Sequence, residues 1–267
     1  MGRSKGYGEA FVAEYYDHVV PYRTRSDIAF YVEAAKKSGG PVLELGCGTG
    51  RILIPVARSG IEIVGVDLSH RMLGVCRDRL QEAHDEVRSR AEIIEADIRD
   101  FDLGRTFNLV TVPFRSFQHL ITVEDQISCL KCVKRHLVDD GRLILDVFNP
   151  SLEALTADNL GEESGEEPRF DMPDGRQVVR RHKVVARDLC KQVQQVELIY
   201  YVTYPDGREE RLVQAFPMRY LFRYEAEHLL ERCGFAVLEI YAGFDRSPYG
   251  STYPGELIIV AAKSQIR

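Results

Sequence analysis

Short apolar runs alternate with amphipathic stretches along the chain between Pro41 and Pro150. Within each amphipathic stretch the apolar positions recur at the spacing of a helix that buries one face. An alternation of apolar strands and amphipathic helices predicts a parallel sheet with right-handed crossovers. The predicted strands are Val42–Leu45, Glu62–Asp67, Ala91–Glu95, Leu109–Pro113 and Arg142–Phe148. The predicted helices are Ile52–Ser59, Arg71–Glu82 and Val123–Leu137, the second capped by Ser69 and the third stopped by Asp140-Gly141.

The pattern changes after Pro150, where three long runs alternate apolar and polar residues with a period of two. This alternation is typical of strands that bury one face. The segment Tyr204-Pro205-Asp206-Gly207 supplies a hairpin turn between the last two runs. The sequence therefore predicts an antiparallel β insertion over residues 151–222, with strands Gln177–Asp188, Lys191–Tyr204 and Glu209–Phe222.

The two ends of the chain complete the predicted fold. Residues 223–267 hold a helix, Tyr224–Cys233, with Gly234 just past its end, and two strands, Ala236–Phe244 and Glu256–Lys263. We expect these strands to be the antiparallel edge of the main sheet. Residues 1–40 form an N-terminal helical cover, with two helices between Phe11 and Ala35 that break near Pro21. The expected fold is α/β, a Rossmann-like seven-stranded mostly parallel sheet, with residues 41–150 as the ligand-binding core.

Charge and composition narrow the partners. The net charge of −6 gives no basic field for nucleic acid, so we expect a small-molecule partner. The N-terminus lacks a signal-peptide core and no stretch approaches the ~20 apolar residues of a membrane span, which predicts a cytoplasmic protein with no membrane contact. The pair Cys129 and Cys132 lies at helical spacing and is interpreted as core packing, so no metal is expected. The basic run Arg180-Arg181-His182-Lys183 is interpreted as a solvated sheet surface.

A glycine-rich turn follows the first core strand in the sequence Val-Leu-Glu-Leu-Gly-Cys-Gly-Thr-Gly-Arg, residues 42–51. Glycines let the backbone turn tightly and approach a ligand, and the next helix directs its first N–H groups toward it. A dinucleotide fold requires G-x-G-x-x-G, but here the spacing is G-x-G-x-G and Arg51 stands where the third glycine should be. The Glu44 carboxylate would repel a pyrophosphate and attract a cation. The turn therefore predicts a positively charged ligand, and a nicotinamide dehydrogenase is disfavoured.

Carboxylates also end the next two predicted strands. In an open parallel sheet, ligands bind outside the carboxyl ends of the strands. Asp67 ends the second strand, where it can accept both hydroxyl hydrogens of a ribose, and the alternative is a residue that merely precedes the helix cap. Asp97 follows the third strand and is either a ligand for an amine or part of a solvent-facing turn. The spacing of Glu44, Asp67 and Asp97 is a stronger signal than any one motif.

Residues 44–50 closely resemble the first motif of class I S-adenosylmethionine-dependent methyltransferases, whose cofactor carries a sulfonium and an ammonium group. The resemblance implies S-adenosylmethionine as cofactor and S-adenosylhomocysteine as product. It implies that Asp67 binds the ribose, that Asp97 accepts the adenine amine and that the backbone of Ile98 meets a ring nitrogen. Met72 packs on the adenine or in the core. The cofactor-binding residues predicted in this way are Glu44, Gly46, Cys47, Gly48, Gly50, Asp67, Leu68, Met72, Asp97, Ile98, Pro113 and Tyr22.

A narrower resemblance appears when residues 97–101, 104–107 and 116–120 are taken together. They are similar to the small-molecule branch that includes amino-sugar N-methyltransferases, and Tyr16-Asp17 and the β insertion extend the likeness. The segment after the fourth strand borders the acceptor in this family, and it lacks the Asn/Asp-Pro-Pro-Tyr/Phe motif of DNA and protein methylating relatives. The resemblance implies acceptor contacts from Arg115, Ser116 and His119. Arg115 departs from the small residue of that branch, and a guanidinium suits a carboxylate or phosphate on the acceptor.

His119 and Tyr16 are the candidate catalytic residues. A neutral imidazole can accept a proton near physiological pH, although holding a deprotonated amine in line can suffice without a base. Tyr16 and Tyr22 either face the sulfonium or are packing residues of the cover. We expect methyl transfer to nitrogen, with oxygen as the runner-up, while the insertion shapes the acceptor pocket or forms a homodimer interface. The alternative is a catalytically silent cofactor-binding scaffold or regulatory protein of the same fold.

Overall fold

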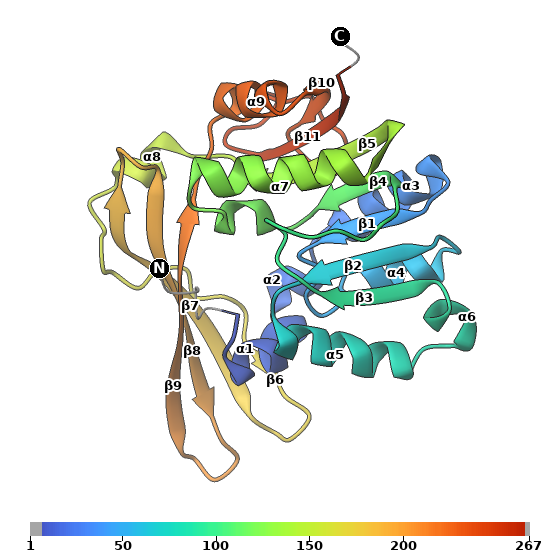
Figure 1. Cartoon of the computed structure of the whole chain (residues 1–267). Coiled ribbons are helices and arrows are strands. Elements are labelled where there is room, and N and C mark those ends of the chain that lie inside the picture. The colour runs from blue at the N-terminus through green and yellow to red at the C-terminus, as the bar shows by residue number, and fades with distance from the viewer. Residues whose placement is uncertain (1–6, 265–267) are drawn as a thin grey trace. The chain divides into compact units, whose positions relative to one another are not determined.

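The computed structural model describes residues 7–264 (Figure 1). The chain forms two compact units. The larger core unit contains Ser26–Leu155 and the chain from Tyr220 onward. The smaller unit contains the chain up to Arg25 together with Thr156–Arg219. Residues 1–40, treated as one cover in the sequence analysis, therefore fall partly in each unit.

The core unit is built on a seven-stranded sheet in the order β10-β11-β5-β4-β1-β2-β3. All neighbouring pairs are parallel except β10 with β11 and β11 with β5. This confirms the predicted Rossmann-like sheet with an antiparallel edge at the C-terminus. The strands are β1 Val42–Leu45, β2 Ile63–Asp67, β3 Ala91–Glu95, β4 Phe107–Val112, β5 Leu137–Phe148, β10 Phe235–Tyr241 and β11 Glu256–Lys263.

Helices pack on both faces of this sheet, as alternating apolar strands and amphipathic helices require (Figure 1). One face packs against α7 and α9, and the other against α3, α4 and α5. Ser69 caps α5 as predicted, because its hydroxyl accepts the Met72 N–H. The helices are α3 Asp27–Ser38, α4 Leu53–Arg58, α5 His70–Gln81, α6 Asp85–Arg88, α7 Val123–His136 and α9 Arg223–Arg232, with the 3-10 turn η2 Ser116–His119. A short helix, α8 Leu152–Thr156, contains the point in the sequence where the chain passes from the larger unit to the smaller one.

The register brings three carboxyl strand ends together. Central strand β1 pairs in parallel with both β2 and β4, so that Glu44 lies opposite Gly65 on one side and Thr111 on the other. The segments that follow β1, β2 and β4 therefore leave the sheet at the same edge. The predicted stop at Asp140-Gly141 is wrong, because β5 begins at Leu137, directly after α7, and its register with β4 shifts between Phe107 and Leu109. The shift leaves residues 138–141 of β5, which include Asp139 and Asp140, outside the paired register opposite Asn108.

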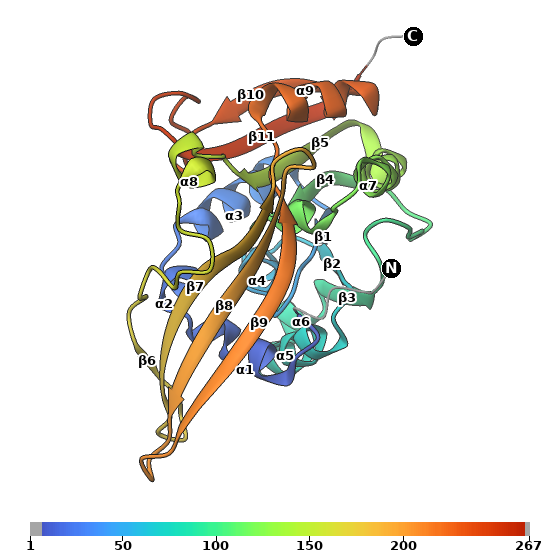
Figure 2. The ribbon, with the colours of Figure 1, turned by 90° about the vertical axis from the view of Figure 1, so that its left-hand side faces the viewer.

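The smaller unit is a four-stranded antiparallel sheet in the order β6-β7-β8-β9. Figure 2 shows its three long strands side by side as a twisted ribbon. One sheet face buries an aromatic cluster in which the Tyr15 ring lies 5.9 Å from Tyr200 and 6.3 Å from Phe170. Its elements are α1 Ala10–Tyr15, η1 Tyr16–His18, α2 Val20–Arg23, β6 Phe170–Asp171, β7 Gln177–Asp188, β8 Val193–Thr203 and β9 Glu209–Arg219.

Two further expectations are corrected here. The predicted break near Pro21 lies at Val19, which is extended between η1 and α2. Pro21 itself lies in the first turn of α2, where a proline is tolerated because that N–H needs no partner. A second interruption, which was not predicted, separates the end of α2 at Arg23 from the start of α3 at Asp27. Arg180 is not solvated: it is 3% exposed, its guanidinium is bound by Glu167, and it lies 4.3 Å from the Tyr22 ring. The next residues in the sequence, Arg181, His182 and Lys183, are also basic, so the pattern did not indicate that Arg180 packs against an aromatic ring. Cys129 and Cys132 are buried in the core on α7, as predicted.

Candidate functional site

The glycine turn between β1 and α4 has the conformation that its sequence requires. Gly46, Gly48 and Gly50 all have positive φ angles, of 75°, 54° and 80°. The turn is fixed to β2, because the Gly46 N–H donates to the Val66 carbonyl at 2.7 Å. Side chains are disfavoured at such angles, so the turn presents backbone groups without Cβ atoms at these three positions.

Residues 113–120, the predicted acceptor segment after β4, lie against this turn at Ser116. A Cβ on Gly46 would come within 2.4 Å of Ser116 Oγ and 2.7 Å of Ser116 Cβ. Ser116 is held in place because its hydroxyl donates to the Pro113 carbonyl at 2.9 Å. The structure thus brings together Ser116, predicted to contact the acceptor, and Gly46, predicted to contact the cofactor.

Asp67 ends β2 beside the same turn. Its carboxylate accepts the Gly48 N–H and the Ser69 N–H, both at 2.8 Å. Burial raises the pKa of Asp67, and the backbone N–H groups of Ser69, Gly48 and Leu68 oppose that rise. The carboxylate is therefore held in one orientation against the glycine turn.

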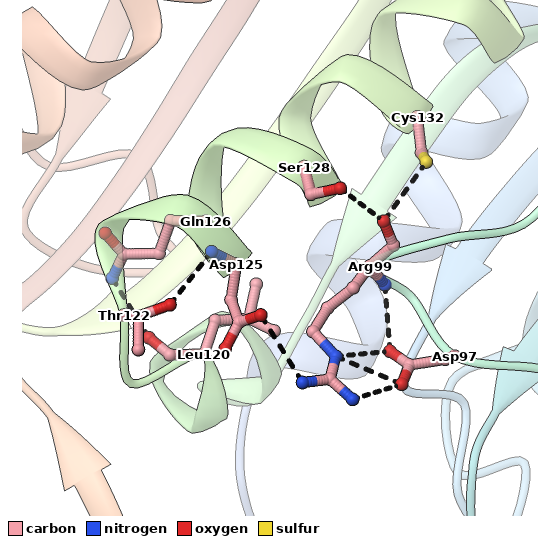
Figure 3. Close-up of polar contacts among 8 residues, drawn as sticks. All are labelled: Asp97, Arg99, Leu120, Thr122, Asp125, Gln126, Ser128 and Cys132. Carbon is pink, nitrogen blue, oxygen red and sulfur yellow. Dashed lines mark hydrogen bonds and ion pairs between the residues drawn. The ribbon is translucent and has the colours of Figure 1, made fainter.

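The loop after β3 joins this group through its backbone. The Ala96 backbone N–H donates to the Asp67 backbone carbonyl at 3.1 Å. Asp97 directly follows Ala96, so this hydrogen bond holds it close to the end of β2. The Asp97 carboxylate is bound by the Arg99 guanidinium, an interaction that the sequence analysis did not foresee (Figure 3). Ile98 is partly buried against the core.

Glu44 is the most unusual group of the site. It is 1% exposed, and its Oε2 atom has no hydrogen-bond partner among residues 7–264. Burial raises the pKa of Glu44 well above its usual value; Arg51 opposes the rise, while Asp67 and Asp27 add to it. The Thr111 hydroxyl, opposite Glu44 in the register, is buried and likewise lacks a partner in the described chain. Unsatisfied buried polar groups of this kind point to a missing polar ligand or water.

Arg51 explains why the third glycine of a dinucleotide turn is absent. Its guanidinium donates to both oxygens of Asp27, at 2.8 and 2.5 Å, and both side chains are buried. The same guanidinium lies 4.8 Å from the Phe114 ring. Asp27, at the start of α3, was missed in the sequence analysis. The available signal was an acidic residue at a helix start in a protein with an arginine just past the glycine turn.

The acceptor segment has a constrained backbone. Phe114 and Arg115 are non-glycine residues with positive φ angles, of 52° and 67°. Buried Asp146 of β5 holds them there, since its carboxylate accepts the Phe114 N–H at 3.1 Å and its carbonyl accepts the Arg115 N–H at 3.2 Å. Strained residues of this kind concentrate at functional sites. Asp146 is a second residue that sequence reasoning missed.

The acceptor candidates differ in how they are placed. Arg115 is half-buried over the Phe148 ring at 5.4 Å, and its guanidinium lies 3.9 Å from Glu256 on β11. His119 is half-buried at the end of η2. The cluster of Arg115 and Glu256 offers one positive and one negative group to a polar acceptor.

The remaining predicted residues are placed as follows. Met72 is buried, and its Cε would lie 3.3 Å from a Cβ on Gly48, so it packs under the glycine turn. Cys47 is buried against Gly65, Leu68 is 48% exposed, and Pro113 lies at the end of β4. Tyr16 and Tyr22 belong to the smaller unit, where their rings lie 5.0 Å apart.

These residues fit S-adenosylmethionine. A buried carboxylate oxygen that lacks a partner in the described chain suits the ligand's ammonium group, and the glycine turn places backbone groups without Cβ atoms next to it. Among residues 7–264, no group of three or more His, Cys, Asp or Glu side chains is placed to hold a metal ion. Within the same range no helix is both long and apolar enough to cross a membrane.

Comparison with known proteins agrees with this geometry. Residues 42–141 match the family model of a methyltransferase domain. The chain is 27% identical over 261 residues to the "Putative methyltransferase YqeM" of Bacillus subtilis (strain 168), a match that covers 95% of this chain and 96% of that protein. The fold resembles that of the CcbJ methyltransferase from Streptomyces caelestis, with a TM-score of 0.77 and 22% identity over 98% of this chain and all of the other.

A second relative is named for its acceptor. It is the dTDP-3-amino-3,6-dideoxy-alpha-D-glucopyranose N,N-dimethyltransferase of Streptomyces fradiae, which is 30% identical over 141 residues. The match covers 51% of this chain and 52% of that enzyme, so the chain spans about half the length of this relative.

Proposed function

We propose that the chain, whose residues 42–141 match a methyltransferase domain, is a class I S-adenosylmethionine-dependent methyltransferase that methylates a nitrogen of a small-molecule acceptor. The observation that carries this proposal is the contact between two segments, the glycine turn and the acceptor segment, at Gly46 and Ser116. Each segment was assigned a separate role from the sequence. Their direct contact suits a reaction in which cofactor and acceptor must meet.

The cofactor residues act by binding and orientation. Glu44 holds the ammonium group, Asp67 the ribose and Asp97 the adenine amine, while the glycine turn provides backbone surface. When bound, S-adenosylmethionine supplies an electrophilic methyl group on a sulfonium. Holding two reactants in line accounts for a large part of such catalysis, so no strong base is required.

The acceptor residues select and hold the nucleophile. In this proposal His119 accepts or orients the proton of the attacking amine, and Arg115 contacts an anionic group of the acceptor. Nitrogen is preferred because the relative from Streptomyces fradiae, which matches about half of this chain, is named as an N,N-dimethyltransferase. Pairing of two copies through the β insertion and a cytoplasmic location remain predictions.

A transfer screen tests the acceptor proposal. The purified protein is incubated with S-adenosylmethionine and a panel of amino sugars, carboxylate-bearing amines and matched hydroxyl compounds. We expect adenosylhomocysteine to form together with a product that is heavier by one methylene, in the amine arm of the panel. Methylation confined to the hydroxyl compounds would move the assignment to oxygen. Cofactor binding without transfer to any compound would instead support the silent scaffold.

The raised pKa of Glu44 predicts a pH-dependent affinity for adenosylhomocysteine. An ammonium group favours the ionised carboxylate, so binding should expel a proton and tighten as the pH rises through the raised pKa. The Glu44→Gln variant should bind about tenfold more weakly at pH 8 and lose most of this slope. Asp67, whose pKa is also raised, leaves a residual slope. Calorimetry in buffers of different ionisation enthalpy measures the released proton.

The same shift has a consequence for stability. Because the folded pKa of Glu44 lies above its unfolded value, the wild type loses stability as the pH rises from the unfolded to the folded pKa. The Glu44→Gln variant lacks this loss, so its melting temperature should exceed that of the wild type increasingly as the pH rises. If the wild type and Glu44→Gln released the same number of protons on binding adenosylhomocysteine, the binding of the ligand's ammonium group by Glu44 would be contradicted.

A further inference from the structure

We propose that Arg99 is a positioning residue that fixes the Asp97 carboxylate toward the amino group of the cofactor's adenine and thereby sets the preference for adenine over a deaminated purine. This inference rests on the proposed function. The two residues lie in the loop between β3 and β4 (Figure 3). No feature of the sequence alone suggested a role for Arg99.

Three N–H groups of Arg99 hold the carboxylate. Its backbone N–H donates to Asp97 Oδ1 at 3.0 Å, and its Nε donates to both carboxylate oxygens, at 2.9 and 3.0 Å. Its Nη2 donates to Asp97 Oδ2 at 2.5 Å. Such a fork fixes both the position and the plane of a carboxylate, whereas a single contact would fix neither.

The guanidinium is anchored from the opposite side by α7. Arg99 Nη1 donates to Asp125 Oδ1 at 3.3 Å, and the Asp125 N–H donates to the Thr122 hydroxyl that caps α7 (Figure 3). Asp97 is therefore oriented by a chain of contacts that ends on a regular helix. A carboxylate that is only 28% exposed and is held in this way has lost its rotational freedom before any ligand binds.

The loop itself does not depend on this side chain. The Arg99 carbonyl accepts the Ser128 hydroxyl at 2.8 Å and the Cys132 thiol at 3.5 Å, and both contacts survive a change of side chain. Ion pairs as exposed as that of Arg99 contribute little to folding. A substitution of Arg99 should therefore change ligand discrimination and leave the fold in place.

Adenine and hypoxanthine present opposite groups to a carboxylate. Adenine offers an amine that donates, whereas hypoxanthine has a carbonyl oxygen at that place, which the carboxylate repels. A fixed carboxylate therefore favours the binding of adenine and disfavours the binding of hypoxanthine. A carboxylate freed from Arg99 must be ordered on binding adenine and can turn away from hypoxanthine, so both effects reduce the discrimination.

Calorimetric titration with S-adenosyl-L-homocysteine and S-inosyl-L-homocysteine tests the inference. We expect the wild type to prefer the adenosyl ligand by about 100-fold, and Arg99→Met to reduce that ratio about tenfold with little change in melting temperature. The matched control is Arg105→Met, since Arg105 forms a similarly exposed ion pair with Glu92 of β3, and its ratio should equal that of the wild type. Asp125→Asn, which keeps Arg99 but removes the negative charge of its anchor, should reduce the ratio by about threefold.

The outcomes separate the inference from the proposed function. If Arg99→Met and Asp125→Asn weaken the binding of both ligands equally, or weaken the binding of neither, the inference is overturned while cofactor binding stands. Should Arg99→Met fail to fold, the ratio measured for Asp125→Asn decides the question alone. A wild type that binds neither ligand would instead overturn the proposed function.

Discussion

Replacing Asp67 by alanine should raise the dissociation constant for adenosylhomocysteine by at least about 100-fold, which is close to 3 kcal/mol. Two losses combine in this variant. The ribose hydroxyls lose a charged acceptor, and the Gly48 N–H loses the partner that holds the glycine turn toward β2. Asp67→Asn retains one acceptor oxygen and should lose only about tenfold. Calorimetric titration measures both variants against the wild type.

A neighbouring carboxylate provides the control for this prediction. Asp78 is exposed on α5, the helix that follows Asp67, and Asp78→Ala should bind the ligand like the wild type. Thermal unfolding should show that Asp67→Ala remains folded, because the removal of a carboxylate whose pKa is raised by burial offsets part of the lost hydrogen bonding. Wild-type affinity in a folded Asp67→Ala variant would exclude Asp67 from the site.

Replacing Gly46 by alanine should destabilise the protein by about 2–4 kcal/mol and abolish measurable ligand binding. The residue has a φ of 75°, which disfavours a side chain, and the new Cβ would lie 2.4 Å from Ser116 Oγ and 2.7 Å from its Cβ. Relief requires a movement of the η2 backbone, because the Cβ of Ser116 cannot rotate away. Chemical denaturation measures the change in the free energy of unfolding.

The chain offers both a control and a rescue for this variant. Gly74 lies in the interior of α5, where an added Cβ would meet no neighbouring element within 4 Å, so Gly74→Ala should stabilise the protein by about 0.5–1 kcal/mol. Adding Ser116→Gly to Gly46→Ala removes the clash but leaves the backbone strain, and should restore about half of the lost stability. Equal stability of Gly46→Ala and Gly74→Ala would contradict the close approach of the glycine turn to Ser116.

The fold was predictable because the apolar period changes where the elements change. The predicted limits of β1, β3, β7 and β11 agree with the structure, and these strands are bounded by charged residues, prolines or glycines that end the apolar period. The start of β5 was missed because Asp139, Asp140 and Gly141 interrupt its pattern. They lie in a register shift between Leu137 and Arg142, and the pairing of these two residues with β4 carries the strand across the interruption. Tertiary pairing overrides local propensity at such positions.

The candidate site was predictable only in its local parts. Glu44 and Asp67 lie at the carboxyl ends of β1 and β2, and Gly46 follows β1 directly, so the rule for parallel sheets places them at one edge. The pairing of Arg51 with Asp27 and the support of Phe114 by Asp146 join segments that are distant in the sequence. Nothing in the spacing of these residues indicates such contacts, and the burial of Arg180 was hidden for the same reason.

One titration tests the central claim most directly: the wild-type protein against S-adenosylmethionine and adenosylhomocysteine, with NAD as the competing ligand class. The Glu44 carboxylate and the glycine turn predict saturable binding of both adenosyl ligands, with one site per chain, and no binding of the dinucleotide. Binding of NAD alone, or of none of the three by folded protein purified without a retained cofactor, would contradict the assignment of this site to S-adenosylmethionine.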